Sequence, residues 1–305
     1  MGKGGSRGLK HRMPGNFPQN LKLFLLNLLL KLRFTYGRFL AYVSMIPAFA
    51  LFLAFAFTPM VYSFIGSFQA PEGALYWYGY VFSNPRLIRD LLFTIAVGFA
   101  TATISFFISI PAALILRKNF RGKTLIHAIL MFPLVVPELI AGYSIWLTLM
   151  PRGLLYSLAN YILPWITLPE LSDEVKLIIA CTWKYFPIMT LLTAAGWEGI
   201  DPDLEAAART LGASPITTFF KVTLPLLIPS LISGYVLVVL RAAGQFSITL
   251  VIGGARLTTI PIDVWYQYNL MNLNLAYTLA VILTTVMVTL VIIFTKVLRR
   301  LYHAP

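Results

Sequence analysis

Three ionisable side chains lie inside long apolar stretches of this 305-residue sequence: Glu138, Lys184 and Arg241. A charged group in a hydrocarbon environment is costly, so each is a candidate for function. A carboxylate at the depth of Glu138 can relay protons or contact a solute. Glu138 and Arg241 can instead form a buried ion pair between two helices, or line a water-filled cavity. Lys184 is expected either to extend toward the outer surface or to line a vestibule.

Other site chemistry is not supported by the residues present. Cys181 is the single cysteine, so neither a disulfide within the chain nor a cysteine-based metal site is expected. The three histidines are scattered, and no metal site is predicted from them. Gly122-Lys123-Thr124 resembles the end of a phosphate-binding loop, but Arg117 stands where the first glycine is required. The chain is therefore not expected to be an enzyme or to bind ATP itself, and an intramembrane enzyme is a weak alternative.

The composition predicts an all-α integral membrane protein. Hydrophobic residues make up 58% of the chain and charged residues 11%, and the mean hydropathy is +0.79. This leaves too little polar surface for a soluble globule. A membrane helix needs about 20 apolar residues. Six transmembrane helices are predicted, at 39–66, 91–116, 125–150, 175–199, 224–252 and 275–297.

The distribution of basic residues predicts the orientation of these helices. Most of the 24 lysines and arginines fall in the first 38 residues, the turn after the second helix, the loop after the fourth and the C-terminal end. By the positive-inside rule, both termini and the 200–223 loop are cytoplasmic. The net charge of +13 is then explained by topology and contact with membrane lipid, without nucleic acid.

The chain is expected to divide into three parts. Residues 1–38 form a basic cytoplasmic tail that includes an amphipathic helix at the membrane interface over 21–34. Residues 39–297 form the six-helix transmembrane domain. Residues 298–305 form a cytoplasmic tail. The connections are also informative: 151–174 is expected to hold a short helix on the outer face, and 253–274 a turn before an extended or partly helical piece.

The 200–223 loop has the residues of two short helices. Asp201-Pro202-Asp203 can cap the first helix, and Ser214-Pro215 can start the second. Gly212 can adopt the left-handed conformation that ends the first helix. The small residues of this loop allow close approach of a partner, and Glu205 and Arg209 can pair at i and i+4. So many organised residues between two membrane helices predict a docking surface.

The same segment resembles the cytoplasmic signature of permease subunits of binding-protein-dependent ABC importers. That signature reads Glu-Ala-Ala, three residues, Gly, nine residues, Ile, any residue, Leu-Pro. Gly212 is followed after nine residues by Val222 and then by Leu224-Pro225. One position differs, because the family glutamate falls on Ala206 and the chain has Glu205 one residue earlier. That shift rotates the carboxylate by about 100° around the helix.

The resemblance covers roughly residues 88–297 and implies that 204–219 couple the chain to a separate ATP-hydrolysing subunit. The residues implied in this contact are Glu205, Ala207, Ala208, Arg209, Leu211, Gly212, Ala213, Leu224 and Pro225. The fifth span borders the translocation path in the family. The residues expected along the path or its gate are Glu138, Lys184, Arg241, Gln245 and Ser247.

The resemblance also implies partners. These are a dimer of ATPase subunits that bind ATP and Mg²⁺, a second permease that is identical or homologous, and an extracytoplasmic solute-binding protein. The binding protein would deliver its solute at the loops 67–90, 151–174 and 253–274. The implied location is the inner, cytoplasmic membrane of a prokaryote, as a multi-pass protein.

The solute and one rival mechanism stay open from sequence. The stretch 244–261 is more similar to permeases for polyamines, iron and oxyanions than to sugar permeases, and a sugar is not excluded. The rival is an ion-coupled secondary transporter that uses Glu138 as a carboxylate relay. This rival does not explain the segment from Glu205 to Pro225.

Overall fold

The computed structural model describes residues 43–118, 120–165, 168–254 and 256–302. These residues form helices and turns, with no strand in the described ranges, as the composition predicts. The expected interfacial helix over 21–34, the first residues of the expected first span and the last three residues of the chain lie outside them. The chain divides into two units, 1–62 and 63–305, and each is described by itself.

The described part of the first unit is helical throughout and contains a π-helical turn. This turn, η1 (Leu53–Phe57), continues into α2 (Thr58–Gly66). Pro59 has no N–H to donate to a carbonyl one turn back, which interrupts the α-helical ladder. Both the N–H and the Oγ1 of Thr58 donate instead to the carbonyl oxygen of Leu53, the latter at 2.8 Å. The helix thus stays continuous across its proline.

Within the described residues, five helices are long and apolar enough to cross a membrane. They are Val43–Gly66, Pro85–Arg117, Asp173–Glu198, Pro215–Ala243 and Leu273–Lys296. A sixth crossing is reached only if the bent pair Lys123–Val135 and Glu138–Ile162, which meet at 102°, counts as one span. The prediction of an all-helical membrane protein is therefore confirmed, with five or six spans.

The second unit contains the remaining helices. In chain order they are α3 (Tyr76–Ser83), α4 (Pro85–Arg117), α5 (Lys123–Val135), α6 (Glu138–Leu149), α7 (Leu154–Ile162), α8 (Asp173–Glu198), α9 (Pro202–Thr210), α10 (Pro215–Thr218), the π-helix η2 (Phe219–Thr223), α11 (Leu224–Ala243), α12 (Ser247–Gly253), α13 (Ile260–Asn269) and α14 (Leu273–Tyr302).

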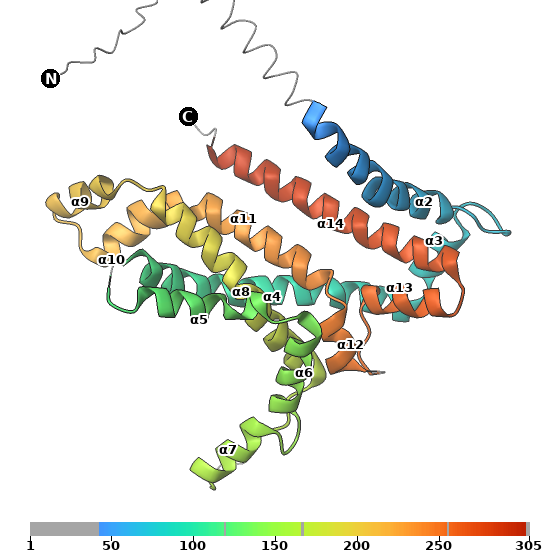
Figure 1. The fold of residues 1–305 in the computed structure, drawn as a ribbon, viewed down its shortest axis with the longest axis horizontal. Helices are drawn as coiled ribbons and strands as arrows, with labels where there is room; N and C mark the ends of the chain where they lie inside the picture. The colour runs from blue at the N-terminus through green and yellow to red at the C-terminus, as the bar shows by residue number, and fades with distance from the viewer. Residues whose placement is uncertain (1–42, 119, 166–167, 255, 303–305) are drawn as a thin grey trace, which may run out of the picture. The chain divides into compact units, whose positions relative to one another are not determined.

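Three long helices, α4, α8 and α11, form the centre of this unit (Figure 1). Small residues at their contacts let the backbones approach closely. A Cβ added at Gly98 of α4 would lie 3.0 Å from the carbonyl oxygen of Val239 of α11. One added at Gly234 of α11 would lie 2.7 Å from the sulfur of Met189 of α8. These glycines therefore set how closely the three helices pack.

The bundle has two ends with different short helices (Figure 1). The α9 end consists of α9, α10 and the last turn of α4. The α13 end consists of α3, α13 and the first turns of α4, together with the start of α14. An apolar cluster that includes Val81, Leu87 and Ile260 holds the α13 end together. The N–H of Ile260 donates to Oγ1 of Thr94 at 2.9 Å, which ties the start of α13 to α4.

The third predicted span, 125–150, is wrong as a single helix. It consists of α5 and α6, and the chain turns between them at Val136 and Pro137. The residue before a proline is disfavoured in the helical conformation, and Val136 has an extended backbone (φ −68°, ψ 127°). The hydropathy of the stretch hides this break, because apolar residues continue through it.

The fifth predicted span, 224–252, is also two helices. α11 ends at Ala243, the chain unwinds at Gly244, and α12 begins at Ser247. The side-chain oxygen of Gln245 accepts the N–H of Ser247 at 2.9 Å and satisfies one of the free donors at the start of α12.

The connections are more helical than expected. The loop 67–90 contains α3, and the extended or partly helical piece of 253–274 is the helix α13. The short helix expected within 151–174 is α7, and its Tyr156 hydroxyl donates to the carbonyl of Pro169 at 2.9 Å. At the C-terminus, α14 runs to Tyr302, through most of the expected tail 298–305.

Candidate functional site

The short helix α9 is closed at both ends by local hydrogen bonds. The side chain of Asp201 accepts the N–H of Asp203 at 2.9 Å at its start. At its end, Gly212 has φ +88° and the N–H of Ala213 donates to the carbonyl of Ala208 at 3.1 Å. A left-handed glycine with this six-residue bond is a standard helix stop. α9 and α10 are thereby joined through a defined bend rather than a loose loop.

The second half of the loop continues into a membrane helix. Ser214 caps α10 by accepting the N–H of Thr217 at 3.2 Å. α10 passes into η2 and then into α11 without an interruption, so 215–243 is one helix. Leu224 and Pro225 stand where the π-helical turn returns to α-helix. Pro225 lacks an N–H, which explains the wider turn before it.

Glu205 is bound by residues from two other elements. Nη1 of Arg117, at the end of α4, donates to both carboxylate oxygens of Glu205 at 2.8 and 2.9 Å. Oγ1 of Thr223, at the end of η2, donates to Oε1 at 2.8 Å. The guanidinium of Arg117 also lies over the ring of Trp197 of α8, 5.5 Å from its centre. The expected pairing with Arg209 is wrong, since Arg209 is exposed and Glu205 turns to α4.

These contacts govern the protonation of Glu205. Its partial burial acts to raise the pKa of the carboxyl, but the bonds from Arg117 and Thr223 outweigh burial and lower the pKa below its ordinary value. Glu205 is therefore ionised at neutral pH. The sequence did not point to Arg117, Thr223 or Trp197. The one available signal was that Arg117 is the basic residue that ends an apolar stretch.

The α9 end exposes several large apolar side chains in an otherwise polar loop. Leu211 is 88% exposed and Ile216 is 72% exposed, and Leu204 and Phe220 are also exposed. A cleft of about 370 Å³ lies beside them, lined in part by Arg117, Ile216 and Phe220. Apolar groups that gather on a protein surface mark interaction sites.

The small residues singled out from the sequence differ in their exposure to solvent. Ala206 and Ala207 are exposed, whereas Ala208 and Ala213 are half-buried. Gly212 is exposed, and a Cβ added to it would meet no atom within 4 Å. The position of the family glutamate, Ala206, is thus open to contact from outside the chain.

Glu138 and Arg241 do not form the ion pair considered from sequence, and no salt bridge joins them among the described residues. Glu138 is the first residue of α6 and accepts a hydrogen bond from the hydroxyl of Tyr185 at 3.1 Å. Arg241 is exposed near the end of α11. The two charges therefore do not meet in the described part of the chain.

Lys184 is buried, and its expected extension to the surface or a vestibule is wrong. Only 5% of the residue is exposed. Its Nζ donates to the carbonyl oxygen of Pro133 at 2.8 Å, and also to those of Leu134 and Val136. The last carbonyls of a helix have no partner within the helix. Lys184 fills that need at the break between α5 and α6.

Gln245 is buried and Ser247 is half-buried at the break between α11 and α12. The side-chain amide nitrogen of Gln245 is buried without a hydrogen-bond partner in the described part of the chain. Buried polar groups of this kind are rare. The break therefore has one donor available to a bound molecule or water.

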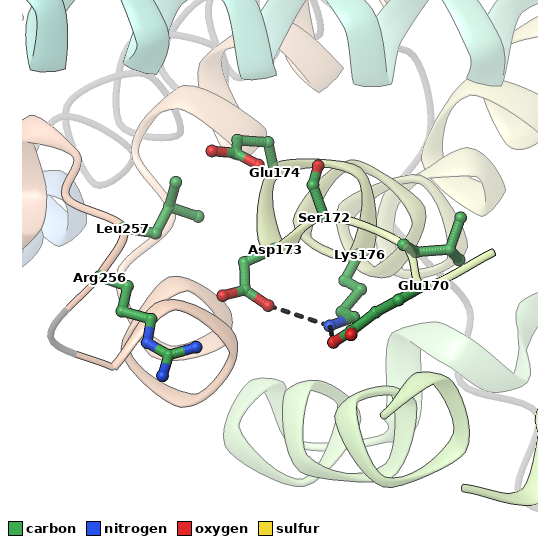
Figure 2. A pocket seen from close by; sticks show the side chains of 8 residues that line it. Glu170, Ser172, Asp173, Glu174, Lys176, Arg256 and Leu257 are labelled. Atoms are coloured by element: carbon green, nitrogen blue, oxygen red, sulfur yellow. Dashed lines mark hydrogen bonds and ion pairs between the residues drawn. The ribbon is translucent and has the colours of Figure 1, made fainter. Parts of the chain in front are cut away.

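A separate pocket of about 390 Å³ lies where the start of α8 faces the chain between α12 and α13. Figure 2 shows that Asp173 and Lys176 of α8 point toward each other, and their charged atoms lie 3.0 Å apart. Glu170 lies 3.9 Å from the same Nζ. Arg256 comes from the opposite wall and has no bond to these carboxylates. No group of three metal-ligating residues exists in the described ranges, this pocket included.

Comparison with known proteins decides the family. Residues 105–303 match the family described as "Binding-protein-dependent transport system inner membrane component", which is more than half of the chain. The chain is a permease of this family. The resemblance inferred from Gly212 and Leu224-Pro225 is thereby confirmed. The permease is a transmembrane transport component of the ABC importer type.

Relatives of the permease differ in how much of it they match. It is 29% identical over 294 residues to the trehalose/maltose transport system permease protein MalF of Thermococcus litoralis, covering 90% of the permease and 98% of that relative. It is 34% identical over 139 residues to the molybdenum transport system permease protein ModB of Escherichia coli strain K12. The second match covers 46% of the permease and 59% of that relative.

Solved structures share the fold. A chain in the crystal structure of a bacterial alginate ABC transporter, in complex with alginate pentasaccharide-bound periplasmic protein, has a TM-score of 0.73 at 18% identity. The similarity covers 89% of the permease and 98% of that chain. A chain of the inward-facing MetNI methionine ABC transporter has a TM-score of 0.54 at 19% identity, covering 70% and 95%. At these identities the likeness concerns the fold.

Proposed function

We propose that the permease forms half of the translocation pathway of an ATP-driven importer and is coupled to a separate ATPase subunit through residues 204–219. A second permease, identical or homologous, supplies the other half. ATP and Mg²⁺ are bound by a dimer of the ATPase subunit. An extracytoplasmic binding protein delivers the solute. The system works in the inner membrane of a prokaryote.

The exposed apolar surface at the α9 end carries this proposal. Leu211 and Ile216 are exposed on a loop whose backbone is capped at Asp201, Gly212 and Ser214. Holding such residues in a fixed geometry without burying them is costly unless a partner covers them. The bonds from Arg117 and Thr223 to Glu205 keep the loop attached to α4 and η2.

The same assignment fixes the orientation. The α9 end is cytoplasmic, because the basic residues at the end of α4 and in the following turn lie there, and both termini are on the same side. The α13 end is then extracytoplasmic. The loops 67–90, 151–174 and 253–274 lie toward the binding protein. ATP-driven closure of the ATPase dimer favours one of two packed states of the permease pair.

The solute is a small molecule for which two chemistries have support. The relative that spans nearly the whole permease is named for trehalose and maltose, and the one that spans about half is named for molybdenum. A sugar and an oxyanion are therefore the first solutes to test, ahead of polyamines and iron. Gln245 and Ser247, at the break in the fifth span, are the proposed contacts along the path, with Arg241 and Glu138 near it.

Retention of the ATPase by purified variants tests the coupling surface. The double variant Leu211→Glu/Ile216→Glu places charges on exposed positions and leaves the described packing intact. We expect at least about a tenfold loss of the co-purified ATPase, since a charge in a buried apolar contact costs more than 1.4 kcal/mol.

Leu158→Glu on α7 is the matched control, because Leu158 is an exposed leucine on another short helix. It is expected to retain the ATPase at the wild-type level. Equal retention by the double variant and by wild type, at equal membrane levels, would contradict the assignment of residues 204–219.

A further inference from the structure

A second cavity, of about 570 Å³, lies at the α13 end and is rich in arginine. Arg86 and Arg89 reach it from the first turns of α4, and Arg256 reaches it from the chain before α13. Three guanidinium groups on one cavity wall repel each other unless a negative charge lies among them.

Only one of the three arginines has a carboxylate partner among the described residues. Nη2 of Arg86 donates to Oδ1 of Asp263 at 2.8 Å, and its Nε lies 3.4 Å from Oδ2 of Asp90. Arg89 and Arg256 are exposed and make no hydrogen bond or ion pair in the described ranges. Even with both carboxylates ionised, the positive charge of this cluster exceeds the negative charge.

The buried carboxylates of Asp90 and Asp263 hold the guanidinium of Arg86. Asp90 and Asp263 are 3% and 1% exposed, whereas the side chain of Arg86 is 48% exposed. A guanidinium has five N–H donors, and Arg86 uses Nη2 and Nε on the two aspartates, which leaves the donors of Nη1 for another partner. Arg86 is thereby held in a defined orientation at the cavity, as a binding residue requires.

The remaining walls suit an organic molecule rather than a bare ion. Trp265 and Tyr266 of α13 line the cavity and are 44% and 48% exposed, and Thr258 adds a hydroxyl. The ring of Trp265 is supported by Phe246, with ring centres 5.9 Å apart. The volume lies in the range of about 300–1,000 Å³ that is usual for small-molecule sites.

We propose that this cavity binds a small organic anion through its carboxylate or another oxyanion group, with Arg89 and Arg256 as the charged contacts, Arg86 as an oriented donor and the aromatic side chains of α13 against the carbon skeleton. Arginine binds planar oxyanions through two parallel hydrogen bonds. The site deepens the proposed function, on which it rests for its extracytoplasmic position, because it selects anionic solutes at the entrance of the pathway.

The acidic pocket shown in Figure 2 shares Arg256 with the arginine-rich cavity and carries the opposite charge. Arg256 lines both cavities, and Asp173, Glu170 and Glu174 line the acidic one. These carboxylates repel an anion from the neighbouring pocket. Removing one of them is expected to strengthen anion binding rather than weaken it.

Calorimetric titration of the full-length permease in lipid nanodiscs, at constant ionic strength, tests the site. The probes are citrate and glucuronate, with glucose as the neutral counterpart of glucuronate. Saturable binding of an anionic probe is expected, with none for glucose. Arg89→Gln/Arg256→Gln is expected to weaken binding at least about tenfold, because two charge-assisted contacts are lost. Arg152→Gln, at an exposed arginine outside the cavity, is expected to retain binding, and Asp173→Asn is expected to strengthen it.

Three results would overturn the proposal. The first is the absence of saturable binding of both anions to a folded wild-type permease. The second is equal binding by wild type and the double arginine variant. The third is a double arginine variant that loses only the solute-binding protein on purification, which would show that the arginines contact that protein. Loss of the ATPase from wild-type preparations would count against the proposed function and not against this site, since all its residues belong to the permease.

Discussion

At the scale of single residues, Glu205 shows how the chain departs from the family signature. The signature glutamate would stand at Ala206, which is exposed. Glu205 instead turns inward to Arg117 and Thr223. A rotation of about 100° around α9 separates the two positions. We infer that Glu205 holds the coupling loop on α4, and that the exposed alanine leaves the adjoining surface uncharged for the ATPase.

A double-mutant cycle on Glu205 and Arg117 tests whether this ion pair holds the loop on α4. Glu205→Gln and Arg117→Gln are each expected to lower the thermal stability of the permease, and the double variant is expected to lose less than the sum. A coupling energy of about 1–3 kcal/mol is typical of a partly buried charge pair. Thermal unfolding in detergent measures it. Glu198→Gln, at an exposed glutamate without an ion pair in the described ranges, is the control.

The pH dependence of this pair follows from the lowered pKa of Glu205. A carboxyl with a lowered folded-state pKa stabilises the protein fully above its ordinary pKa of about 4.3. That stabilisation is lost only as the pH falls through the lowered value. Between pH 5 and pH 8 the coupling energy should therefore stay constant, and a fall within this range would show that another group dominates.

Lys184 offers a second test at this scale. Lys184→Met keeps the length of the side chain but leaves the carbonyls of Pro133, Leu134 and Val136 without their donor. Each buried polar group left unsatisfied costs about 1–3 kcal/mol, so a drop of several degrees in melting temperature is expected. Arg241→Met, at an exposed position, should change stability by less than about 0.5 kcal/mol. Similar effects of both substitutions would contradict the capping role of Lys184.

At the scale of elements, the bend between α9 and α10 determines what the coupling surface presents. Gly212 has φ +88°, a conformation that only glycine, asparagine and aspartate adopt readily. The site of its missing Cβ is open within the chain. An asparagine or aspartate at Gly212 therefore meets no atom within the chain and, apart from the backbone strain of the left-handed conformation, acts mainly on a partner that contacts this position.

Gly212→Asp and Gly212→Asn form a matched pair of variants, because both side chains tolerate the left-handed backbone and differ in charge. We expect both to reach the membrane at wild-type levels. Gly212→Asp should lower solute uptake at least about tenfold, since it places a charge in an apolar contact. Gly212→Asn should reduce uptake less. Normal uptake by the aspartate variant would count against the coupling surface.

At the scale of the whole molecule, the α13 end gives stability a pH dependence. Burial, with the negative charge of Asp90 beside it, raises the pKa of Asp263 to about 7. An acid whose pKa is raised on folding stabilises the protein below its unfolded value of about 3.9, and this stabilisation is lost as the pH rises through about 7. The folded permease should therefore become less stable between pH 5 and pH 8.

Asp263→Asn imitates the protonated carboxyl at every pH. We expect it to raise the melting temperature at pH 8 by about 2–4 °C, which corresponds to about 1 kcal/mol for a domain of this size. At pH 5 the difference should shrink. A variant that is destabilised equally at both pH values would show that the negative charge on Asp263 is needed by Arg86.

The helical fold and the two short helices of the 200–223 loop could be predicted because their signals are local. Apolar runs indicate spans, and the capping residues Asp201, Gly212 and Ser214 indicate helix ends. Pro137 was a local signal for the break in the third span, but hydropathy outweighed it. Arg117, which binds Glu205, and the carbonyls that bind Lys184 could not be predicted, because they lie 88 and about 50 residues away along the chain. The arginine cavity was missed for the same reason.

The helix that runs from α10 through η2 to α11 is uninterrupted, so it can transmit a displacement from one end to the other. Its 29 residues span about 43 Å at 1.5 Å per residue. A displacement of Ile216 at one end is therefore expected to move the break next to Gln245 at the other end. One residue inserted into η2 would turn the far end by about 100° while leaving both ends folded. The number of residues in this helix is therefore constrained, as are the residues at its two ends.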